Sequence, residues 1–260
     1  MKFTDIIYEK KDAVGWIIIN REKAMNAFRT ETMKDMCLAL EDADLDGSIG
    51  VVVITGAGDK AFCVGGDKEE ASSKTAWGPG MDYWHTRIIT AIRAIPKPVI
   101  AAVNGWCLGG GNIVHMTCDL SIASDRAKFG QVGPKLGSFD AGIGGPYLAR
   151  LVGVRKAKEI WFLCKQYTAQ EAVEMGLVNK VVPHDQLRAE TEKWCEEMLK
   201  MGPTSLKFMK YGINADTDSI LGMVNMGMAG VRLYWGSEEA NEWKQAFWQK
   251  KAPNSKKFRK

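Results

Sequence analysis

Residues 97–130 read KPVIAAVNGWCLGGGNIVHMTCDLSIASDRAKFG and hold the pattern that decides the fold. Val99–Val103 (VIAAV) is a short run rich in β-branched residues, typical of a buried strand. A glycine cluster follows it directly in Asn104–Asn112, and a helix is expected to begin at Ile113 immediately after the glycines. A further short strand is expected at Leu120–Ala123. Strand, turn, helix and strand in this order favour an α/β fold.

The segments that precede this stretch follow the same alternation. Buried strands are expected at Val14–Ile19 (VGWIII) and Val51–Thr55 (VVVIT). Between them, Thr30–Leu45 carries apolar residues at the spacing of one helical face, and the acidic Glu31 lies near its start. The alternation of strand and helix therefore extends over the first half of the chain and argues against a sandwich of two antiparallel sheets.

The remainder of the chain, after about Gly142, is predicted to be mostly helical. The helices are expected at Lys156–Cys164, Ala169–Met175, Leu187–Met201 and Thr204–Gly212, and one strand at Val178–Val182. No linker rich in Pro, Gly and Ser interrupts the chain. We therefore expect a core domain over residues 1–200 and a helical C-terminal extension over residues 201–260, packed on the core or on a neighbouring subunit.

Composition restricts the class of protein. The chain has 260 residues, of which 46% are hydrophobic and 25% charged, as in an ordinary globular domain. The start, MKFTDIIYEKKD, has no apolar run of seven residues, and no stretch approaches 18 apolar residues, so neither a signal peptide nor a membrane span is expected. Without a CxxC or Cys/His spacing, the cysteines are expected to be reduced core thiols in the cytoplasm, and no metal site is expected. The six cysteines are Cys37, Cys63, Cys107, Cys118, Cys164 and Cys195.

Two glycine clusters adjoin predicted strands, in Ala61–Asp67 (AFCVGGD) and in Asn104–Asn112 (NGWCLGGGN). Glycine allows positive φ and a close approach of the backbone to a ligand, which leaves N–H groups free to point into a cavity. If both turns converge on one atom, and a helix N-terminus adds its partial positive charge, they form an oxyanion hole. The alternative is that the glycines only make tight turns. Neither cluster matches a phosphate loop or a dinucleotide fingerprint, so nucleotide binding by those routes is not expected.

Four motifs in order resemble the crotonase (enoyl-CoA hydratase/isomerase) superfamily over essentially the whole chain. They are INREKAMNAF (19–28), VVVITGAGDKAFCVGGD (51–67), KPVIAAVNGWCLGGGNIVHMTCDLSIASDRAKFG (97–130) and AQEAVEMGLVNKVVP (169–183). The resemblance implies an α/β spiral of ββα units. It also implies a homotrimer or a dimer of trimers, an acyl-CoA thioester as substrate, no cofactor beyond that coenzyme A, and a C-terminal extension that takes part in trimerisation and in the active site.

The motif positions assign residues to this substrate. The resemblance implies that the thioester oxygen accepts hydrogen bonds from the N–H groups of Gly66 and Gly110. It further implies that the coenzyme A adenine is bound near Lys60, Ala61 and Phe62. Both assignments follow from the resemblance and not from spacing.

The positions that carry two glutamates in enoyl-CoA hydratases are Ile113 and Gly133 in this chain. Without these acids, addition of water to a double bond has no acid and base, so simple hydration is not expected. The carboxylate that remains near the glycine clusters is Asp140, in a glycine-broken loop where an Asp is ordinarily a turn former or a helix cap.

The sequence around Asp140 resembles the Dieckmann subgroup of the superfamily, which contains 1,4-dihydroxy-2-naphthoyl-CoA synthases and 2-ketocyclohexanecarboxyl-CoA hydrolases. The similar segments are FGQVGPKLGSFDAG (129–142) and YLARLVGVRKAKEIWFLCKQY (147–167). The resemblance implies that Asp140 is the active-site carboxylate and that Ser138 orients it. The tyrosine that donates a proton in the synthases is expected at Tyr234 in RLYWGSEEA, although counting back from the acidic pair places Trp235 there.

Other positions differ from the synthases. Those enzymes are thought to hold bicarbonate with a threonine and a tryptophan; Trp161 matches the tryptophan, but Val132 replaces the threonine, which argues against bicarbonate dependence. Residues 68–87, taken as a loop, lack the glycine- and tyrosine-rich segment of the synthases, which indicates a different acyl group. We therefore expect hydrolytic ring opening of a cyclic β-keto acyl-CoA in aromatic or alicyclic acid degradation, 2-ketocyclohexanecarboxyl-CoA giving pimeloyl-CoA. Ring closure of o-succinylbenzoyl-CoA is the main alternative.

A non-catalytic, RNA-binding relative is the alternative from another class. The net charge is +4, and much of it lies in Lys250–Lys260 (KKAPNSKKFRK), which could meet an anionic partner or form a solvated basic end. Apart from Phe258 this tail has no aromatic residue on which bases could stack, so a nucleic acid is not expected as a partner. Without a long apolar stretch, a membrane is not expected as a partner either. The three histidines, His85, His115 and His184, are widely spaced and are assigned to no metal or catalytic dyad; His115 is expected to pack within a helix.

Overall fold

The computed structural model describes residues 2–72 and 79–259, and in them it confirms an α/β fold with two sheets. The larger sheet has the order β1 (Ile6–Lys11), β2 (Val14–Ile19), β3 (Val51–Gly56), β5 (Val99–Val103), β7 (Leu120–Ser124) and β10 (Lys180–Val182). The smaller sheet has the order β4 (Ala61–Cys63), β6 (Trp106–Leu108), β8 (Lys128–Gly130) and β9 (Gln166–Thr168). Neighbouring strands are parallel except for β1 with β2 and β8 with β9.

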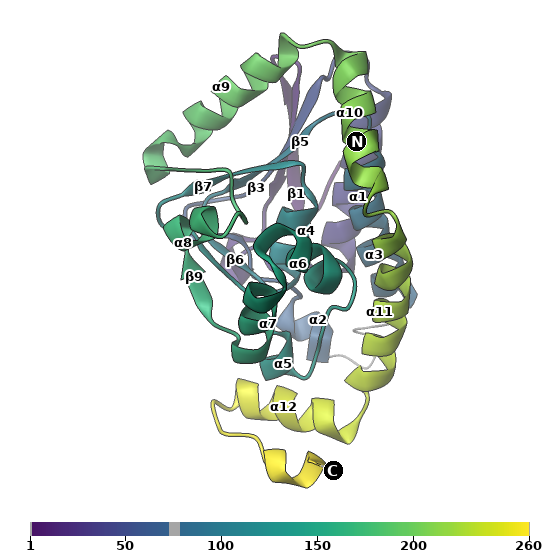
Figure 1. Ribbon diagram of the computed structural model, residues 1–260, viewed down its shortest axis with the longest axis vertical. Helices are drawn as coiled ribbons and strands as arrows, with labels where there is room; N and C mark the ends of the chain where they lie inside the picture. Colours follow the sequence, from purple (N-terminus) through teal and green to yellow (C-terminus); the bar gives the residue numbers. More distant parts are fainter. Residues whose placement is uncertain (1, 73–78, 260) are drawn as a thin grey trace.

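The central strands of the larger sheet are buried on both faces, which explains why they are continuous apolar runs. Side chains alternate along a strand, so Val51 and Val53 of β3 face one side while Val52 and Ile54 face the other. The first pair joins the small apolar cluster beneath α9 (Leu187–Leu199), and the second joins the main core. Figure 1 shows α9 lying across one side of this sheet.

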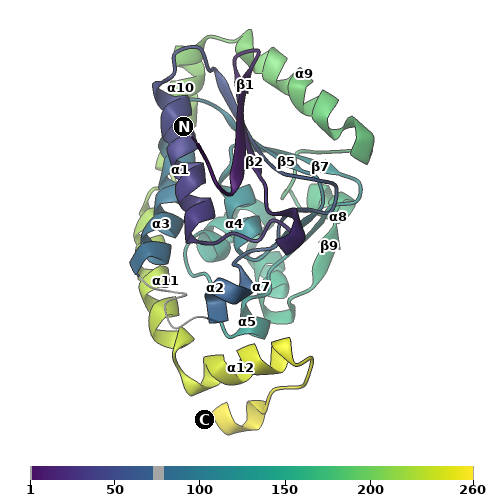
Figure 2. The same ribbon diagram turned by 180° about the vertical axis from the view of Figure 1, so that it is seen from behind.

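The remaining helices lie around the two sheets. They are η1 (Glu22–Ala24), α1 (Thr30–Leu45), α2 (Lys68–Ser72), α3 (Pro79–Ala94), α4 (Gly110–Thr117), α5 (Gly133–Leu136), η2 (Ile143–Tyr147), α6 (Leu148–Val152), α7 (Val154–Leu163), α8 (Ala169–Glu174), η3 (His184–Gln186), α10 (Pro203–Ala215), α11 (Ser219–Trp235), α12 (Glu238–Trp248) and η4 (Ser255–Phe258). Helix α1 packs against β1 and β2 on the face opposite α9. Helix α3 packs against both α1 and α11. Figure 2 shows α1 and α3 along one side of the molecule.

The order of the strands in the smaller sheet places three chain segments next to one another. Strands β3, β5 and β7 are each followed along the chain by a strand of the smaller sheet, namely β4, β6 and β8. These three are parallel neighbours, so the segments that leave them emerge side by side at one edge. The edge therefore brings together Val64–Gly66, Gly109–Gly110 and Gln131–Gly133, which lie far apart in the sequence.

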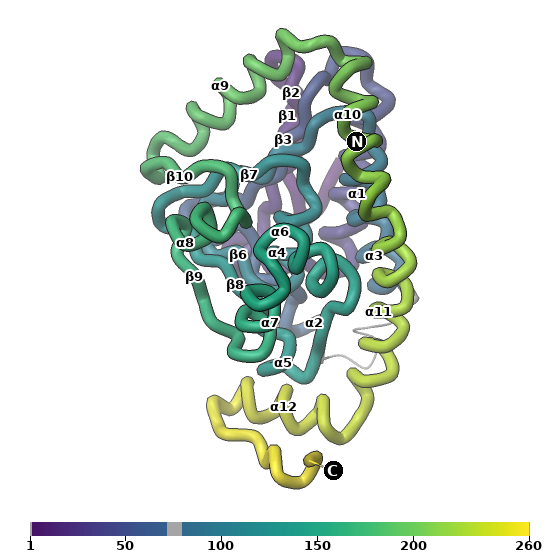
Figure 3. Tube along the Cα trace, viewed as in Figure 1, coloured from purple at the N-terminus to yellow at the C-terminus, as the bar shows by residue number. Residues whose placement is uncertain are grey.

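The C-terminal helices α11 and α12 pack on the outside of this edge. Helix α11 packs along α3, and after it the chain turns so that α12 packs on α5 (Figure 3). The basic tail folds back on α12: Lys257 pairs with Glu238 at 3.1 Å, and the Phe258 ring contacts Trp243. The described part of the tail is thus attached to α12, and Lys260 lies outside the described residues.

The predicted core elements are confirmed, with small shifts at their ends. Strand β10 begins at Lys180, two residues after its expected start, and α4 begins at Gly110, not at Ile113, because the last glycines already belong to the helix. The interpretation of residues 68–87 as a loop is wrong for α2 and for the first half of α3, while residues 73–78 of that segment lie outside the described part. The six cysteines are free and buried, as predicted. Among residues 2–72 and 79–259, no helix is long and apolar enough to cross a membrane.

An ion pair between buried Lys210 and the partly exposed Asp119 attaches α10 to the core, and its loss should lower the stability of the fold. The Lys210 ammonium lies 2.7 Å from Asp119 and also donates to the carbonyl oxygens of Ile92 and Lys97. Lys210→Met leaves the Asp119 carboxylate without its cation, and we expect the free energy of unfolding to fall by about 1.5–3 kcal/mol in urea denaturation. Lys207→Met, on the exposed face of the same helix, is the control, expected to change it by less than about 0.5 kcal/mol. Equal effects of the two variants would contradict a role for the pair.

A second buried group makes stability depend on pH. The His115 ring is 1% exposed, its Nδ1 lies 3.0 Å from Asn112 Oδ1 and its Nε2 lies 2.7 Å from Ser121 Oγ, which agrees with its expected place inside a helix. Burial lowers the pKa of His115 to about 3. Below pH 6.5 the unfolded chain binds a proton at this residue that the folded chain does not, so stability falls as the pH falls. Between pH 7 and 5 we expect this loss to be about 2 kcal/mol in urea denaturation. His115→Gln should lose less over the same range, and an identical pH dependence would contradict the prediction.

Candidate functional site

A cavity of about 350 Å³ lies at the edge where β4, β6 and β8 end. Its floor comes from the three segments that follow these strands, and its walls come from α3, α5, α11 and α12. The volume is within the range of cavities that hold small organic ligands. The convergence that the two glycine clusters predicted is therefore present, because Gly66 and Gly110 both line this one cavity.

The Gly66 amide is directed away from its neighbouring segment. Phe28 forms an isolated parallel bridge with Gly66, in which the Phe28 N–H donates to Gly65 O and its carbonyl accepts from Asp67 N, both at 2.8 Å. Because N–H groups alternate in direction along an extended chain, the Gly66 N–H points away from Phe28. Gly110 is the first residue of α4, so its N–H has no partner within the helix. Both glycines line the cavity, so two main-chain donors that their own segments leave unused lie at the same space, beside the N-terminal end of a helix.

Glycine is needed at these turns because the two backbones touch. Gly65 has φ +96°, and a Cβ placed on it would lie 3.1 Å from Gly110 N. A Cβ on Gly111 would lie 2.1 Å from Cys63 O, so only glycine allows α4 to pack so closely on β4. The glycines therefore make tight turns, which was the alternative to an oxyanion hole. The same turns also place two main-chain donors at one cavity.

Asp140 lines the cavity, and its orientation is fixed by the backbone. Its Oδ1 accepts hydrogen bonds from Gly142 N at 2.9 Å and from Gly144 N at 2.8 Å. The second oxygen makes no hydrogen bond within the described residues. Ser138 also lines the cavity, but in the described part of the chain its hydroxyl makes no hydrogen bond to Asp140. The turn that Asp140 caps thus positions the carboxylate, and the role that the resemblance gives to Ser138 stays a prediction.

The two positions of the missing hydratase acids are also at this cavity. Ile113 is 2% exposed and presents an apolar side chain to it. A Cβ on Gly133 would lie 2.8 Å from Ser138 O and 2.9 Å from Trp161 Cζ3. The space that a glutamate would need at Gly133 is therefore occupied by the Ser138 backbone and the Trp161 ring.

Trp161 and Val132, the positions compared with a bicarbonate site, both line the cavity. The Trp161 indole N–H donates to Gly144 O, so it is already used in holding the Asp140 turn. Nearby, Gln131 is 1% exposed and lines the cavity, and its side-chain Nε2 has no hydrogen-bond partner among the described residues. A buried amide without an acceptor favours binding of a ligand oxygen at this point.

Aromatic side chains from the C-terminal helices close the outer wall. Trp235 of α11 and Trp248 of α12 line the cavity, and Lys68 lies on its rim, 5.6 Å from the Trp248 ring. Lys244 donates to Trp235 O at 2.8 Å and lies over the Trp235 ring, which holds this residue in place. Such a wall is suited to an apolar acyl group.

Tyr234 does not line the cavity; its ring contacts Phe139, which does, at a centroid distance of 5.9 Å. Burial, with a further contribution from Glu239, raises the pKa of Tyr234. The tyrosine therefore lies one ring away from the space where a substrate would be, and Trp235 occupies the adjoining position in the wall.

A separate hollow of about 190 Å³ includes Lys60 and Ala61 together with Asn26 and Ala57. Asn26 donates to Ala61 O at 2.7 Å, which keeps this strand end in place. Phe62 is fully buried in the main core and does not line this hollow. The hollow is where the resemblance expects the adenine, and its occupant stays a prediction.

His85 is a cavity residue that sequence reasoning did not assign. It lies on α3, is 5% exposed and lines the cavity, and its ring lies 6.4 Å from the Phe28 ring. The signal was available: His85, Ile88, Ile89 and Ile92 are spaced as one helical face, which is buried in the structure. Taking residues 68–87 as a loop concealed it.

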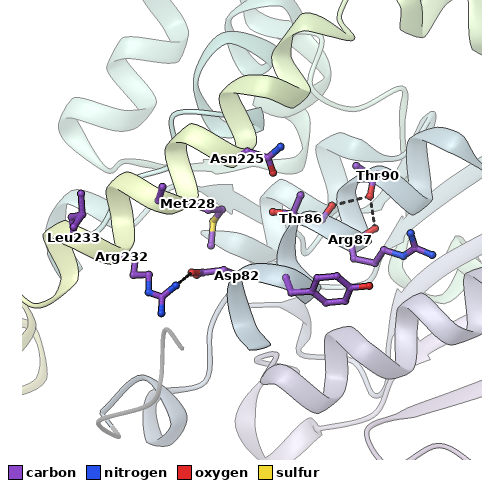
Figure 4. A pocket seen from close by; sticks show the side chains of 10 residues that line it. Asp82, Thr86, Arg87, Thr90, Asn225, Met228, Arg232 and Leu233 are labelled. Atoms are coloured by element: carbon purple, nitrogen blue, oxygen red, sulfur yellow. Dashed lines mark hydrogen bonds and ion pairs between the residues drawn. The ribbon is translucent and has the colours of Figure 1, made fainter. Parts of the chain in front are cut away.

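A larger hollow, of about 600 Å³, lies between α3 and α11 on the surface (Figure 4). Its charged groups are paired with neighbours: Asp82 with Arg232 at 3.4 Å, and Arg87 with Glu41. Neither glycine turn reaches it, so it is not the site that the sequence predicted. Within residues 2–72 and 79–259, no three His, Cys, Asp or Glu side chains gather as metal ligands.

Comparison with known proteins identifies relatives that share this architecture. A family model described as enoyl-CoA hydratase/isomerase matches residues 9–256. Solved structures of an enoyl-CoA hydratase from Mycobacterium avium subsp. paratuberculosis K-10 and an enoyl-CoA hydratase/isomerase from Xanthobacter autotrophicus Py2 are each 28% identical, with TM-scores of 0.88 and 0.86. The matches cover 97% of this chain and 99% of the first, and 95% of this chain and 94% of the second. An enoyl-CoA hydratase from Bacillus anthracis is 30% identical, with a TM-score of 0.76, over 96% of this chain and 98% of that one.

Proposed function

Because this chain belongs to the enoyl-CoA hydratase/isomerase (crotonase) family, whose members process coenzyme A thioesters, we propose that it opens the ring of a cyclic β-keto acyl-CoA by hydrolysis. The proposed substrate is 2-ketocyclohexanecarboxyl-CoA, and the product is pimeloyl-CoA. The single observation that carries the proposal is that Asp140 is the one carboxylate among the described residues lining the cavity. The two positions at which a hydratase carries its acids hold Ile113 and Gly133.

The proposed reaction begins with water. Asp140 takes a proton from a water molecule, which adds to the ring ketone carbon and leaves the ketone oxygen as an alkoxide. The unpaired Gln131 amide is the available donor for this oxygen. Collapse of the alkoxide forms a carboxylic acid and breaks the bond between that carbon and the α-carbon.

The electron pair of the broken bond moves onto the thioester oxygen as an enolate. The Gly66 and Gly110 N–H groups are the proposed donors to this oxygen, and the N-terminal end of α4 favours its negative charge. Loss of one such donor typically costs about 2.7–4 kcal/mol in transition-state stabilisation. Protonation of the α-carbon completes the reaction, so atoms and charge balance with one water consumed.

Ring closure of o-succinylbenzoyl-CoA is the second candidate, because it forms an enolate at the same thioester carbon. The observation that favours opening over closure is the bonding of the Trp161 N–H to Gly144 O, together with Val132 in place of a threonine. This donor set offers less to a bicarbonate ion than a threonine and a free tryptophan N–H would, so bicarbonate is not part of the proposal.

Mass spectrometry of thioester products tests the assignment. The purified protein is incubated separately with 2-ketocyclohexanecarboxyl-CoA, o-succinylbenzoyl-CoA and crotonyl-CoA. We expect gain of one water by the first and no change in the other two. Loss of water from the second would replace hydrolase by synthase, and gain of water by crotonyl-CoA alone would show a hydratase and refute the proposal.

A further inference from the structure

His85 is a buried titratable group facing the proposed reaction space without a partner. Its Nδ1 is inaccessible to solvent, and neither ring nitrogen makes a hydrogen bond within the described residues. A buried polar group in this condition is costly, so its retention favours a role that a bound substrate completes.

The charges around His85 come chiefly from one residue of the same cavity. Burial lowers the pKa of His85, and the Asp140 carboxylate acts in the opposite direction. Asp82, one turn earlier on α3, is paired with Arg232, and Lys68 lies on the cavity rim beside Trp248. The imidazole is therefore neutral at rest, and Asp140 is the group that can stabilise it when it takes up a proton.

The reaction needs such a group, because the enolate must gain a proton at carbon. Asp140 holds a proton after it has activated water, but its Oδ1 is fixed by Gly142 and Gly144. Tyr234 lies one ring outside the cavity, behind Phe139. Among the described cavity residues that can both accept and release a proton near neutral pH, His85 is the one not yet given a task.

We propose that His85 is a catalytic residue that accepts the proton Asp140 takes from water and delivers it to the α-carbon of the thioester enolate. Resting on the proposed function, the step balances: Asp140 returns to a carboxylate, the imidazolium returns to neutral imidazole, and a C–H bond forms at the α-carbon. By microscopic reversibility, the same imidazole removes an α-proton from the ring-opened product thioester.

Exchange of that α-proton in D2O isolates the step from C–C cleavage. Pimeloyl-CoA is incubated with each enzyme, and deuterium uptake at the α-carbon is followed by mass spectrometry. We expect the wild type to exchange, His85→Gln to be at least about 100-fold slower, and Tyr234→Phe to match the wild type. His184→Gln is the matched control, since His184 bonds Ser124 Oγ at 3.0 Å and does not line the cavity.

Two results would overturn the inference. Exchange at the wild-type rate in His85→Gln, with a loss in Tyr234→Phe, would assign the proton to the tyrosine and leave the proposed function intact. Absence of both exchange and ring opening in the wild type would reject the proposed function and the inference together.

A measurement on the wild type covers the case in which His85→Gln does not fold, as judged by thermal denaturation. The exchange rate should fall at low pH, and the apparent pKa of that fall should change strongly with temperature. The reason is that an imidazole has a much larger ionisation enthalpy than a carboxylate. An apparent pKa that does not change with temperature would assign the fall to a carboxylate and count against His85.

Discussion

Asp140→Asn should lower kcat for ring opening by about 10²–10⁴-fold while leaving thioester binding nearly unchanged. The asparagine oxygen can still accept from Gly142 N and Gly144 N, so the turn keeps its shape. The amide cannot take a proton from water, and only the chemical step is lost. The measurement is steady-state turnover of 2-ketocyclohexanecarboxyl-CoA beside calorimetric binding of a non-reactive CoA thioester.

Asp216→Asn is the matched control for Asp140→Asn, because Asp216 pairs with Arg150 on the exposed surface, away from the cavity. Its turnover should equal that of the wild type. A kcat for Asp140→Asn within about threefold of the wild type would mean that another group activates the water.

Gly65→Ala should reduce kcat/KM by about 10²–10³-fold through the proposed oxyanion donors. The added Cβ would lie 3.1 Å from Gly110 N, close enough to displace this amide from the thioester oxygen. The substitution also brings backbone strain, since φ at Gly65 is +96°.

Gly153→Ala separates strain from the effect on the amide. Gly153 has φ +80°, and no atom lies within 4 Å of a Cβ placed on it, so the variant carries strain without a neighbour to displace. Both variants should lower the free energy of unfolding by about 1–3 kcal/mol, but only Gly65→Ala should lose activity. Equal activities of the two variants would argue that the Gly110 amide is not used.

Most of the core fold could be predicted from the sequence, because local pattern and packing agree there. Strands β3 and β5 are buried on both faces, so their sequences are continuous apolar runs that can be recognised without knowing which strands they pair with. Strands β4, β6, β8 and β9 have three residues each, too short for a periodic signal, and their pairing comes only from the path of the chain.

The candidate site was predictable only in part. The two glycine clusters indicated main-chain donors because glycine lets the backbone approach a ligand closely, and the resemblance singled out Gly66 and Gly110 within them. Asp140 stood out through its loop. Gln131 and Trp248 were not assigned, since they reach the cavity through tertiary packing. His85 was not assigned because residues 68–87 were taken as a loop. Ser138 and Tyr234 were assigned by resemblance; the role of Ser138 stays a prediction, and His85 is proposed in place of Tyr234 as the proton donor.

Infrared spectroscopy of a bound thioester tests the proposed enolate stabilisation most directly. Cyclohexanecarbonyl-CoA, labelled with ¹³C at the thioester carbonyl, lacks the ring ketone and should bind without reacting. Two main-chain donors at its oxygen should move the carbonyl stretch to lower wavenumber on binding, and Gly65→Ala should remove most of that shift. A carbonyl stretch that stays at its value in water when the thioester is fully bound would contradict the placement of its oxygen between Gly66 and Gly110.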